Sequence, residues 1–251
     1  MRHINKFIII TLIFSFLYGQ SNRSGIKPGS DRSDGKGPFK RMVIRGATLI
    51  NGNGSPPVGP VDIVIENNRI KEVQSVGYPG VPIKESRRPK KGDFEIDASG
   101  HYVLPGFVDL HVHAGSAQKA PDTDYVYKLW LAHGVTTVRG VGLGPFDFTL
   151  KEKARSKANK ITAPRIWAYQ RPGQGNNWKG GPVRDPENAR RWVRFAAKEG
   201  IDGLKLVAYE PALMEALIDE AKKQKLGTTA HLGQTGVARM NTLDAARLGL
   251  G

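Results

Sequence analysis

The alternation of apolar and polar positions divides the chain near residue 106. Before that point, short β-rich runs at 42–44, 47–50, 61–65 and 70–76 are separated by the turn signals "RG", "NGNGSPPVGP" and "ENN". Closely spaced strands with such turns are typical of antiparallel pairing. The stretch "FEIDASGHYVLPG" adds two more short strands before Pro105 and Gly106 interrupt the pattern. The sequence therefore predicts a small β-sandwich domain, antiparallel in its pairing, over residues 42–105.

After residue 106 the chain alternates strands with helices. Strands are expected to begin near 106, 134, 165, 201 and 228, in "GFVDLHVH", "GVTTVRGVG", "RIWAYQ", "IDGLKLVAY" and "TTAHLG". The intervals of 28, 31, 36 and 27 residues each fit one strand, one helix and their loops. Strands that alternate with helices in this way predict a parallel sheet.

Two of the intervening helices carry clear boundary signals. In "DPENARRWVRFAAKEG", Asp185 is expected as the N-cap, Pro186 as the first helical residue and Gly200 as the stop. In "EPALMEALIDEAKKQKLG", Pro211 begins the helix and Gly227 is expected to end it. Its lysines lie late in the helix, where the helix dipole favours them.

Two architectures fit this alternation. A nucleotide-binding doubly wound sheet is disfavoured because no Gly-x-Gly-x-x-Gly follows the first strand. A (β/α)8 TIM barrel takes about 250 residues, and residues 106–251 have room for about five of its eight units. The pattern alone leaves open a small open sheet and a TIM barrel that is cut off partway.

The first forty residues have a different character. Residues 1–20 combine a basic start with an apolar core that is too short to span a bilayer, which is typical of a signal peptide cleaved between Gly19 and Ser21. The alternative is a membrane anchor. Residues 21–41 are rich in Gly, Ser, Pro and charge, and are interpreted as a solvated linker. We therefore expect an exported protein, periplasmic or secreted, without a stable membrane anchor.

Charge and cysteine content narrow the chemistry. The chain carries 38 Lys and Arg against 23 Asp and Glu, for a net charge of +15. Much of this charge lies in the predicted linker and in "IKESRRPKKGD", without regularly interleaved aromatic residues, so we expect a solvated basic surface and no nucleic-acid partner. The absence of cysteine excludes disulfides and thiolate metal ligands.

The candidate chemistry begins in "FVDLHVH". Residues two apart on a strand share a face, so His111 and His113 are expected to point the same way as Asp109. The apolar residues between them are expected on the opposite face: Val108, Leu110 and Val112. Two imidazoles side by side on a strand fill a core poorly and chelate a metal well.

Two later residues strengthen this interpretation. Lys205 interrupts the apolar fourth strand, where a buried amine is costly unless it has a role. His231 ends the fifth strand. Together with His111 and His113 they lie toward the C-terminal ends of their strands, the rim at which TIM barrels carry their active sites.

The residues "VLPGFVDLHVH", preceded by "IRGATLINGNG" and "VDIVIENNRI", resemble the metal-dependent amidohydrolase superfamily over residues 42–251. The likeness is greatest to its imidazolonepropionase-like and Xaa-Pro dipeptidase (prolidase-like) branch. It implies an α/β fold: a partial (β/α)8 TIM barrel of about five of eight units, residues 106–251, after the β-sandwich domain. By the same resemblance His111 and His113 bind one metal, Lys205 is carboxylated and bridges two metals, and His231 binds the second.

The resemblance also implies an activity. A metal-bridging hydroxide would attack the carbonyl of a small amide, dipeptide or cyclic imide and cleave its C–N bond. Two divalent metal ions are expected, and nitrogen and oxygen ligands suit Zn²⁺. Two candidate substrate contacts are Arg171, in the loop "YQRPGQGNNWKGG" that also holds Trp178, and Tyr209, which is four residues after Lys205 and so expected on the same strand face. A plain surface loop is the alternative for the former.

The superfamily pattern further requires a histidine from the sixth strand and a catalytic aspartate from the eighth. Both would lie beyond Gly251. We therefore expect this chain to be an N-terminal piece of a hydrolase, inactive by itself. A non-catalytic exported binding module is the competing hypothesis.

Overall fold

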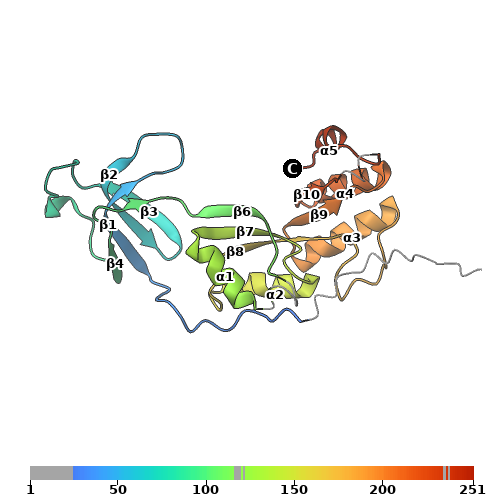
Figure 1. The fold of residues 1–251 in the computed structure, drawn as a ribbon, viewed down its shortest axis with the longest axis horizontal. Coiled ribbons are helices and arrows are strands. Elements are labelled where there is room, and N and C mark those ends of the chain that lie inside the picture. The colour runs from blue at the N-terminus through green and yellow to red at the C-terminus, as the bar shows by residue number, and fades with distance from the viewer. Residues whose placement is uncertain (1–24, 116–119, 121, 234–235, 237) are drawn as a thin grey trace, which may run out of the picture.

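The computed structural model describes residues 25–115, 120, 122–233, 236 and 238–251. They form a β domain and an α/β domain that follow one another along the chain (Figure 1). The signal peptide predicted for residues 1–20 lies outside the described residues. Within the described part, no helix has the length and apolar character needed to cross a membrane.

The β domain is one mixed sheet of five strands. Its strands are β1 (Arg41–Leu49), β2 (Val58–Glu66), β3 (Arg69–Ser75), β4 (Phe94–Asp97) and β5 (Tyr102–Val103), in the order β3-β2-β1-β4 with β5 also on β1. The predicted antiparallel pairing holds for β1 with β2 and for β2 with β3. It is wrong for β4 and β5, which run parallel to β1. The long connection after β3, which contains the short 3-10 helix Glu85–Arg87, returns the chain to the start of β1 before β4 begins.

The turn expected at "RG", Arg45 and Gly46, is instead a bulge inside the continuous strand β1. Gly46 has φ +70°, and the register of β1 against β2 shifts between Ile44 and Ala47. A glycine in this conformation adds a residue to a strand and bends it without ending the pairing. The freed N–H of Gly46 donates to the buried carboxylate of Asp62, which also accepts from Arg45 and Arg88.

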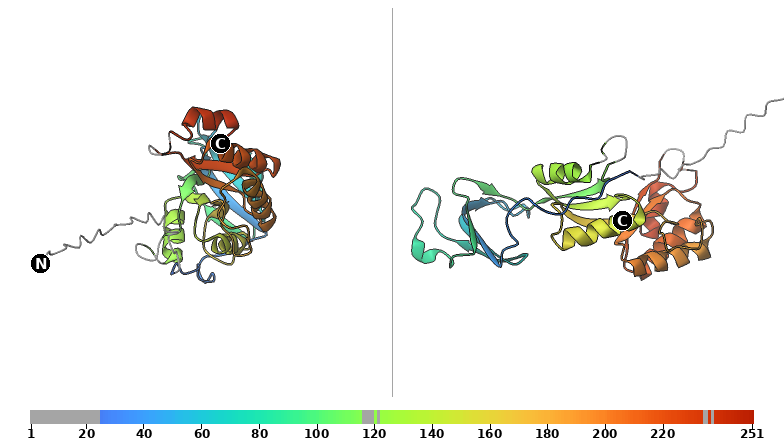
Figure 2. Two further views of the ribbon diagram at one scale, coloured as in Figure 1. Left: turned by 90° about the vertical axis from the view of Figure 1, so that its right-hand side faces the viewer. Right: turned by 90° about the horizontal axis from the view of Figure 1, so that it is seen from below.

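The α/β domain has a parallel five-stranded sheet. Its strands are β6 (Phe107–Val112), β7 (Val135–Val141), β8 (Arg165–Gln170), β9 (Gly203–Val207) and β10 (Gly227–His231), in the order β10-β9-β8-β7-β6. Its helices are α1 (Thr123–Ala132), α2 (Phe146–Lys157), α3 (Pro186–Glu199), α4 (Pro211–Lys223) and α5 (Thr242–Leu248). The sheet curls, with α1 to α4 along its outer side (Figures 1 and 2). The predicted partial TIM barrel with a preceding β domain is confirmed.

The helix boundaries agree with the sequence signals in α3 and differ in α4. Asp185 caps α3 by accepting from the Asn188 N–H, and Gly200 ends it with φ 97°. Gly227 does not end α4, because the helix stops at Lys223 and Lys225 already has φ 56°. Gly227 is instead the first residue of β10.

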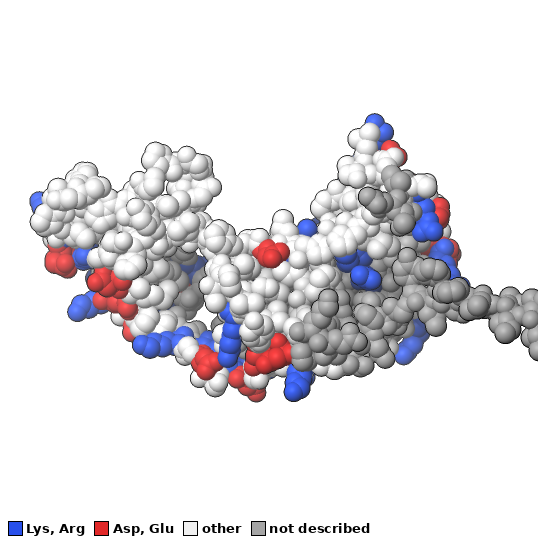
Figure 3. Space-filling view, in the orientation of Figure 1, with Lys and Arg blue, Asp and Glu red and all other residues white. Residues whose placement is uncertain are grey.

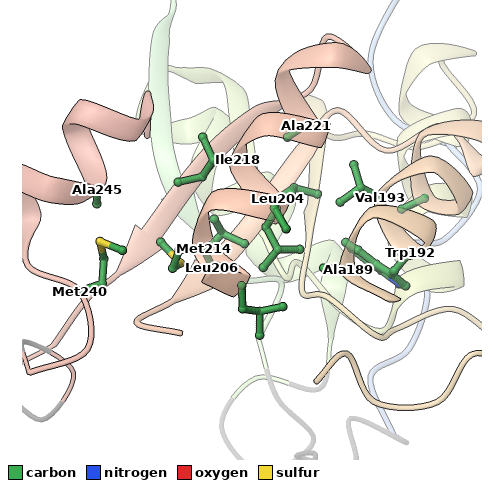
Figure 4. Packing of buried hydrophobic residues seen from close by; sticks show 14 of the residues in the cluster. Ala189, Trp192, Val193, Leu204, Leu206, Met214, Ile218, Ala221, Met240 and Ala245 are labelled. Atoms are coloured by element: carbon green, nitrogen blue, oxygen red, sulfur yellow. The ribbon is translucent and has the colours of Figure 1, made fainter. Parts of the chain in front are cut away.

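The largest apolar core lies between β9 and the helices α3 and α4 (Figure 4). Trp192 and Val193 of α3 meet Met214 and Leu217 of α4, and all four are fully buried. Leu204 and Leu206 enter the same core from β9. Since these leucines flank Lys205, alternation along the strand directs the lysine to the inner side of the curled sheet.

The other helix pair, α1 and α2, is covered by the segment 26–34, here called the strap. The strap runs along these helices and leads on toward the β domain (Figures 1 and 2). The Gly29 N–H donates to Glu152 of α2, the Ser30 N–H donates to Asp124 of α1, and Asp31 pairs with Arg155. This part of the predicted linker is therefore bound to the barrel domain and not freely solvated.

Charged side chains do not form a continuous basic surface on the face seen in Figure 3, where Lys and Arg are interspersed with Asp and Glu along the lower side.

Candidate metal centre on the inner side of the half barrel

The strand β6 and its C-terminal end position two histidines together. The rings of His111 and His113 have centroids 5.5 Å apart and meet edge to face. His113 Nδ1 lies 3.1 Å from the carbonyl oxygen of Gly142, which follows β7. The carboxylate of Asp109 accepts from the His111 N–H, so it folds back on its own strand.

The opposite side of β6 differs from the expectation. Val112 is buried, but Val108 and Leu110 are 57% and 56% exposed. β6 is the edge strand of the sheet, and its apolar contacts to the described helices are concentrated at Val112 and the following Ala114.

The fifth strand brings a third imidazole to the same place. His231 is the last residue of β10, and its ring stacks on that of His111 with a centroid distance of 4.5 Å and an interplanar angle of 5°. Since β6 and β10 are the two edges of the sheet, this contact spans the inner side of the curled sheet. The structure thus brings His111, His113 and His231 together.

Lys205 lies in the strand next to β10. It is 1% exposed, and its Nζ is buried without a hydrogen-bond partner among the described residues. An unpaired buried amine is costly, so this nitrogen indicates a missing partner or a chemical modification. Burial, together with the positive charges of Arg171 and Arg139, lowers the pKa of Lys205 from 10.5 to about 8.

The same environment disfavours the protonated form of two of the histidines. Burial lowers the pKa of His111 and of His231, and the positive charge of Lys205 adds to both shifts. A metal ligand must present an unprotonated nitrogen, so these shifts favour coordination. Lys205 is in register with Thr229 of β10, two residues before His231, so it lies beside the same cluster.

The donor set is incomplete without Lys205. No three His, Cys, Asp or Glu side chains in the described part of the chain are arranged so that they alone would hold a metal ion. The three imidazoles fit a divalent metal if Lys205 contributes an oxygen ligand, which a carboxylated amine does. The orphaned Nζ is the observation that favours this chemistry.

The two candidate substrate residues lie near this cluster on less regular backbone. The charge of Arg171 influences the pKa of Lys205, His231 and Tyr209. Burial raises the pKa of Tyr209. The argument that Tyr209 shares a strand face with Lys205 is wrong, because β9 ends at Val207 and the Tyr209 N–H turns back to donate to the Val207 carbonyl.

Trp178, in the same loop as Arg171, contacts helix α3. Its ring packs on Phe195 of α3 at a centroid distance of 5.4 Å, and its indole N–H donates to the Gly181 carbonyl. A surface depression near α5, lined in part by Pro211, Arg239 and Met240, contains none of the candidate metal residues.

Arg139 is a functional candidate that the sequence interpretation missed. It lies within β7, where it donates to the Leu110 carbonyl and sits over the ring of Tyr169. The signal was the same as for Lys205: a charged residue inside an apolar strand, in "VTTVRGV".

The comparison with known proteins assigns the chain. A family model described as the amidohydrolase family matches residues 102–247, which contain all four candidate metal residues. The chain belongs to the amidohydrolase family. Amidohydrolases are generally metal-dependent, and the relatives found here include hydrolases that act on C–N bonds.

Two sequence relatives illustrate the range of amidohydrolases similar to this chain. An adenine deaminase of Methanoculleus marisnigri is 33% identical over 132 residues, or 49% of this chain and 24% of the relative. An enamidase of Eubacterium barkeri is 25% identical over 219 residues, or 82% of this chain and 53% of the relative.

The solved structures with a similar fold include prolidase-like amidohydrolases. A Xaa-Pro dipeptidase with bound methionine has a TM-score of 0.62 at 21% identity, covering 84% of this chain and 60% of that one. A putative prolidase from Bifidobacterium longum has a TM-score of 0.61 at 23% identity, covering 85% and 54%. These two likenesses concern the fold. The chain spans less than two thirds of the length of each of these four proteins.

Proposed function

We propose that this chain provides the metal-binding half of a hydrolase that cleaves C–N bonds in small molecules. The observation that carries the proposal is the meeting of three imidazoles and one unpaired buried amine on the inner side of the sheet. His111, His113 and His231 would supply nitrogen ligands, and Lys205 would supply an oxygen ligand after carboxylation. When bound, divalent metal ions of this kind polarise a carbonyl and lower the pKa of water.

The chain's own contribution is to prepare these ligands. The lowered pKa makes the free amine of Lys205 far more abundant near neutral pH than for an ordinary lysine. The amine nitrogen attacks the carbon of CO₂, an N–C bond forms, and one proton leaves the nitrogen to give a carbamate. The inner side of the sheet excludes water from the amine, since Lys205 is 1% exposed. Nitrogen ligands with carbamate oxygens suit two Zn²⁺ ions.

The substrate class is inferred from the polar side chains beside the metal residues. Arg171 offers a cation and Tyr209 a hydroxyl beside the metal residues, which suits a small amide with a carboxylate or a polar ring. A dipeptide and a cyclic imide both meet this description. Related proteins bear the names adenine deaminase, dihydroorotase, D-phenylhydantoinase and Xaa-Pro dipeptidase, so their substrates form the first panel to assay.

The decisive experiment compares two lysine variants of the complete protein that the gene encodes. Lys205→Ala should lose most of its bound metal and its hydrolase activity, and short carboxylic acids should restore part of the activity. Lys222→Ala, on the exposed side of α4, is the matched control and should bind metal as the wild type does. ¹³CO₂ should give a carbamate signal in the wild type and not in Lys205→Ala. Normal metal content and normal turnover in Lys205→Ala would contradict the proposal.

Reading the gene past the codon for Gly251 tests the expectation of a longer hydrolase. A continuing frame with an early histidine and a late aspartate supports it, whereas a stop codon at this point would contradict it.

We also propose that the protein is exported, because residues 1–20 combine a basic start with a short apolar core. N-terminal sequencing of the mature protein should begin between Gly19 and Ser21. A mature protein that retains Met1 would contradict export by cleavage.

A further inference from the structure

Arg139 joins the two edges of the parallel sheet. Its Nε donates to the Leu110 carbonyl of β6 at 2.6 Å, and its Nη2 lies 3.4 Å from Thr229 Oγ1 of β10. β6 and β10 are not neighbours in the sheet, since three strands separate them. One side chain from β7 therefore reaches both edges across the inner side.

The two contact points of Arg139 are next to the two stacked histidines. Leu110 immediately precedes His111, and Thr229 is two residues before His231, on the same face of β10. Thr229 is also in register with Lys205 on the neighbouring strand. The guanidinium contact on β10 is thus level with Lys205 and one layer below His231, toward the N-terminal ends of the strands.

Tyr169 fixes the position of the guanidinium. The Arg139 guanidinium carbon lies 5.2 Å from the centroid of the Tyr169 ring. The ring itself rests on Gly203 and Gly227, the first residues of β9 and β10, where any Cβ would overlap it. Glycine at both positions is what admits the ring, so the arginine rests on a support built from three strands.

We infer that Arg139 is a positioning residue that holds His111 and His231 at the spacing of the metal centre; this inference rests on the metal role proposed for those histidines. The planar guanidinium is suited to the task, because it directs several N–H donors in fixed directions and stacks on an aromatic ring. Lysine has the charge but cannot bridge both strands and stack in the same way. Residues that orient metal ligands in this manner typically change metal affinity by roughly 10–100-fold when replaced.

The test uses the full-length protein and the substitutions Arg139→Gln, Arg139→Lys and Thr229→Val. In the metal-free wild type the stacked rings of His111 and His231 should give a nuclear Overhauser contact. Arg139→Gln should lose this contact and bind Zn²⁺ roughly 10–100-fold more weakly. Arg139→Lys should retain the fold yet give a changed visible spectrum with Co²⁺. Thr229→Val should shift the same quantities less.

Arg165→Gln is the matched control, since Arg165 is an exposed arginine at the start of the neighbouring strand β8. It should leave the histidine contact, the Zn²⁺ affinity and the Co²⁺ spectrum unchanged. If Arg139→Gln fails to fold, Arg139→Lys and Thr229→Val decide the matter through the same readouts. Unchanged ring contact and Co²⁺ spectrum in both would overturn the inference. A wild type that binds no metal would contradict the proposed function but not this inference. The contact between the two rings in metal-free protein would still test whether Arg139 positions them.

Discussion

The two helix pairs on the outer side of the sheet are held in place by different forces. Helices α3 and α4 meet through fully buried apolar side chains such as Trp192 and Leu217. Helices α1 and α2 bury less apolar surface together and are tied by the strap, whose contacts are hydrogen bonds and ion pairs. The first arrangement depends on volume and packing, the second on specific polar partners, of which Glu152 is the buried one.

The comparison predicts the largest effect at Trp192. Replacing this fully buried indole by alanine removes apolar contacts and leaves a cavity, so Trp192→Ala should lower the free energy of unfolding by about 3–5 kcal/mol. Urea unfolding of variant and wild type measures the difference. Trp167→Ala is the control, since Trp167 is 48% exposed and should change stability much less. Equal losses in the two variants would show that the α3–α4 core does not dominate.

On the strap side, the expected effect at Glu152 is smaller and more local. Its buried carboxylate accepts from the Gly29 N–H at 2.9 Å and pairs with Arg155 at 2.7 Å. Glu152→Ala leaves both donors without this partner, which should cost about 1–3 kcal/mol. Limited proteolysis should then cut the strap faster than in the wild type. Glu187→Ala, on the exposed first turn of α3, should leave the cleavage rate unchanged.

The α3–α4 half could be predicted from the sequence and the strap could not. The apolar stripes of the two helices, the Asp185 cap and the Gly200 stop are local signals, and they fixed the elements correctly except for the end of α4. The strap residues carry no periodic pattern. Their partners lie 123 and 94 positions away for Gly29 and Ser30, so no local signal specifies them.

The candidate site also has features that local sequence signals predict and features that they do not. Strand alternation brought His111 and His113 to one side, and the βα spacing brought Lys205 and His231 to neighbouring strands. The stacking of His111 on His231 depends on the curl of the whole sheet, which alternation does not specify. The same curl explains why Arg139 was missed: its partners come from strands that are not its sequence neighbours.

The pH dependence of the free energy of unfolding tests the burial of Lys205, on the strand β9 that packs against α3 and α4. Its pKa is about 8 in the folded chain against an ordinary value of 10.5, so the unfolded chain binds more protons between these values and stability rises with pH there. In metal-free protein without CO₂, the free energy of unfolding should increase by on the order of 1 kcal/mol from about pH 7 to about pH 9. Lys205→Met should remove this part of the slope. A wild-type slope equal to that of Lys205→Met would mean that the amine is solvated in the folded state.

The smallest effect is expected at the outermost contact of the strap. Asp31 pairs with Arg155 at 2.9 Å, but its side chain is 91% exposed, so water and salt screen the pair. Exposed pairs of this kind contribute less than about 1 kcal/mol, and Asp31→Asn should therefore change the free energy of unfolding by no more than that. Arg155 keeps its bond to the buried Glu152 in this variant, so the strap should stay protected from protease. Measuring Asp31→Asn and Glu152→Ala separately and together distinguishes the two contacts. If the exposed pair matters only through Arg155, the double variant should lose at most the small Asp31→Asn increment beyond the loss of Glu152→Ala. A loss at Asp31 as large as that at Glu152 would instead mean that the strap is held along its whole length and not mainly at its buried carboxylate.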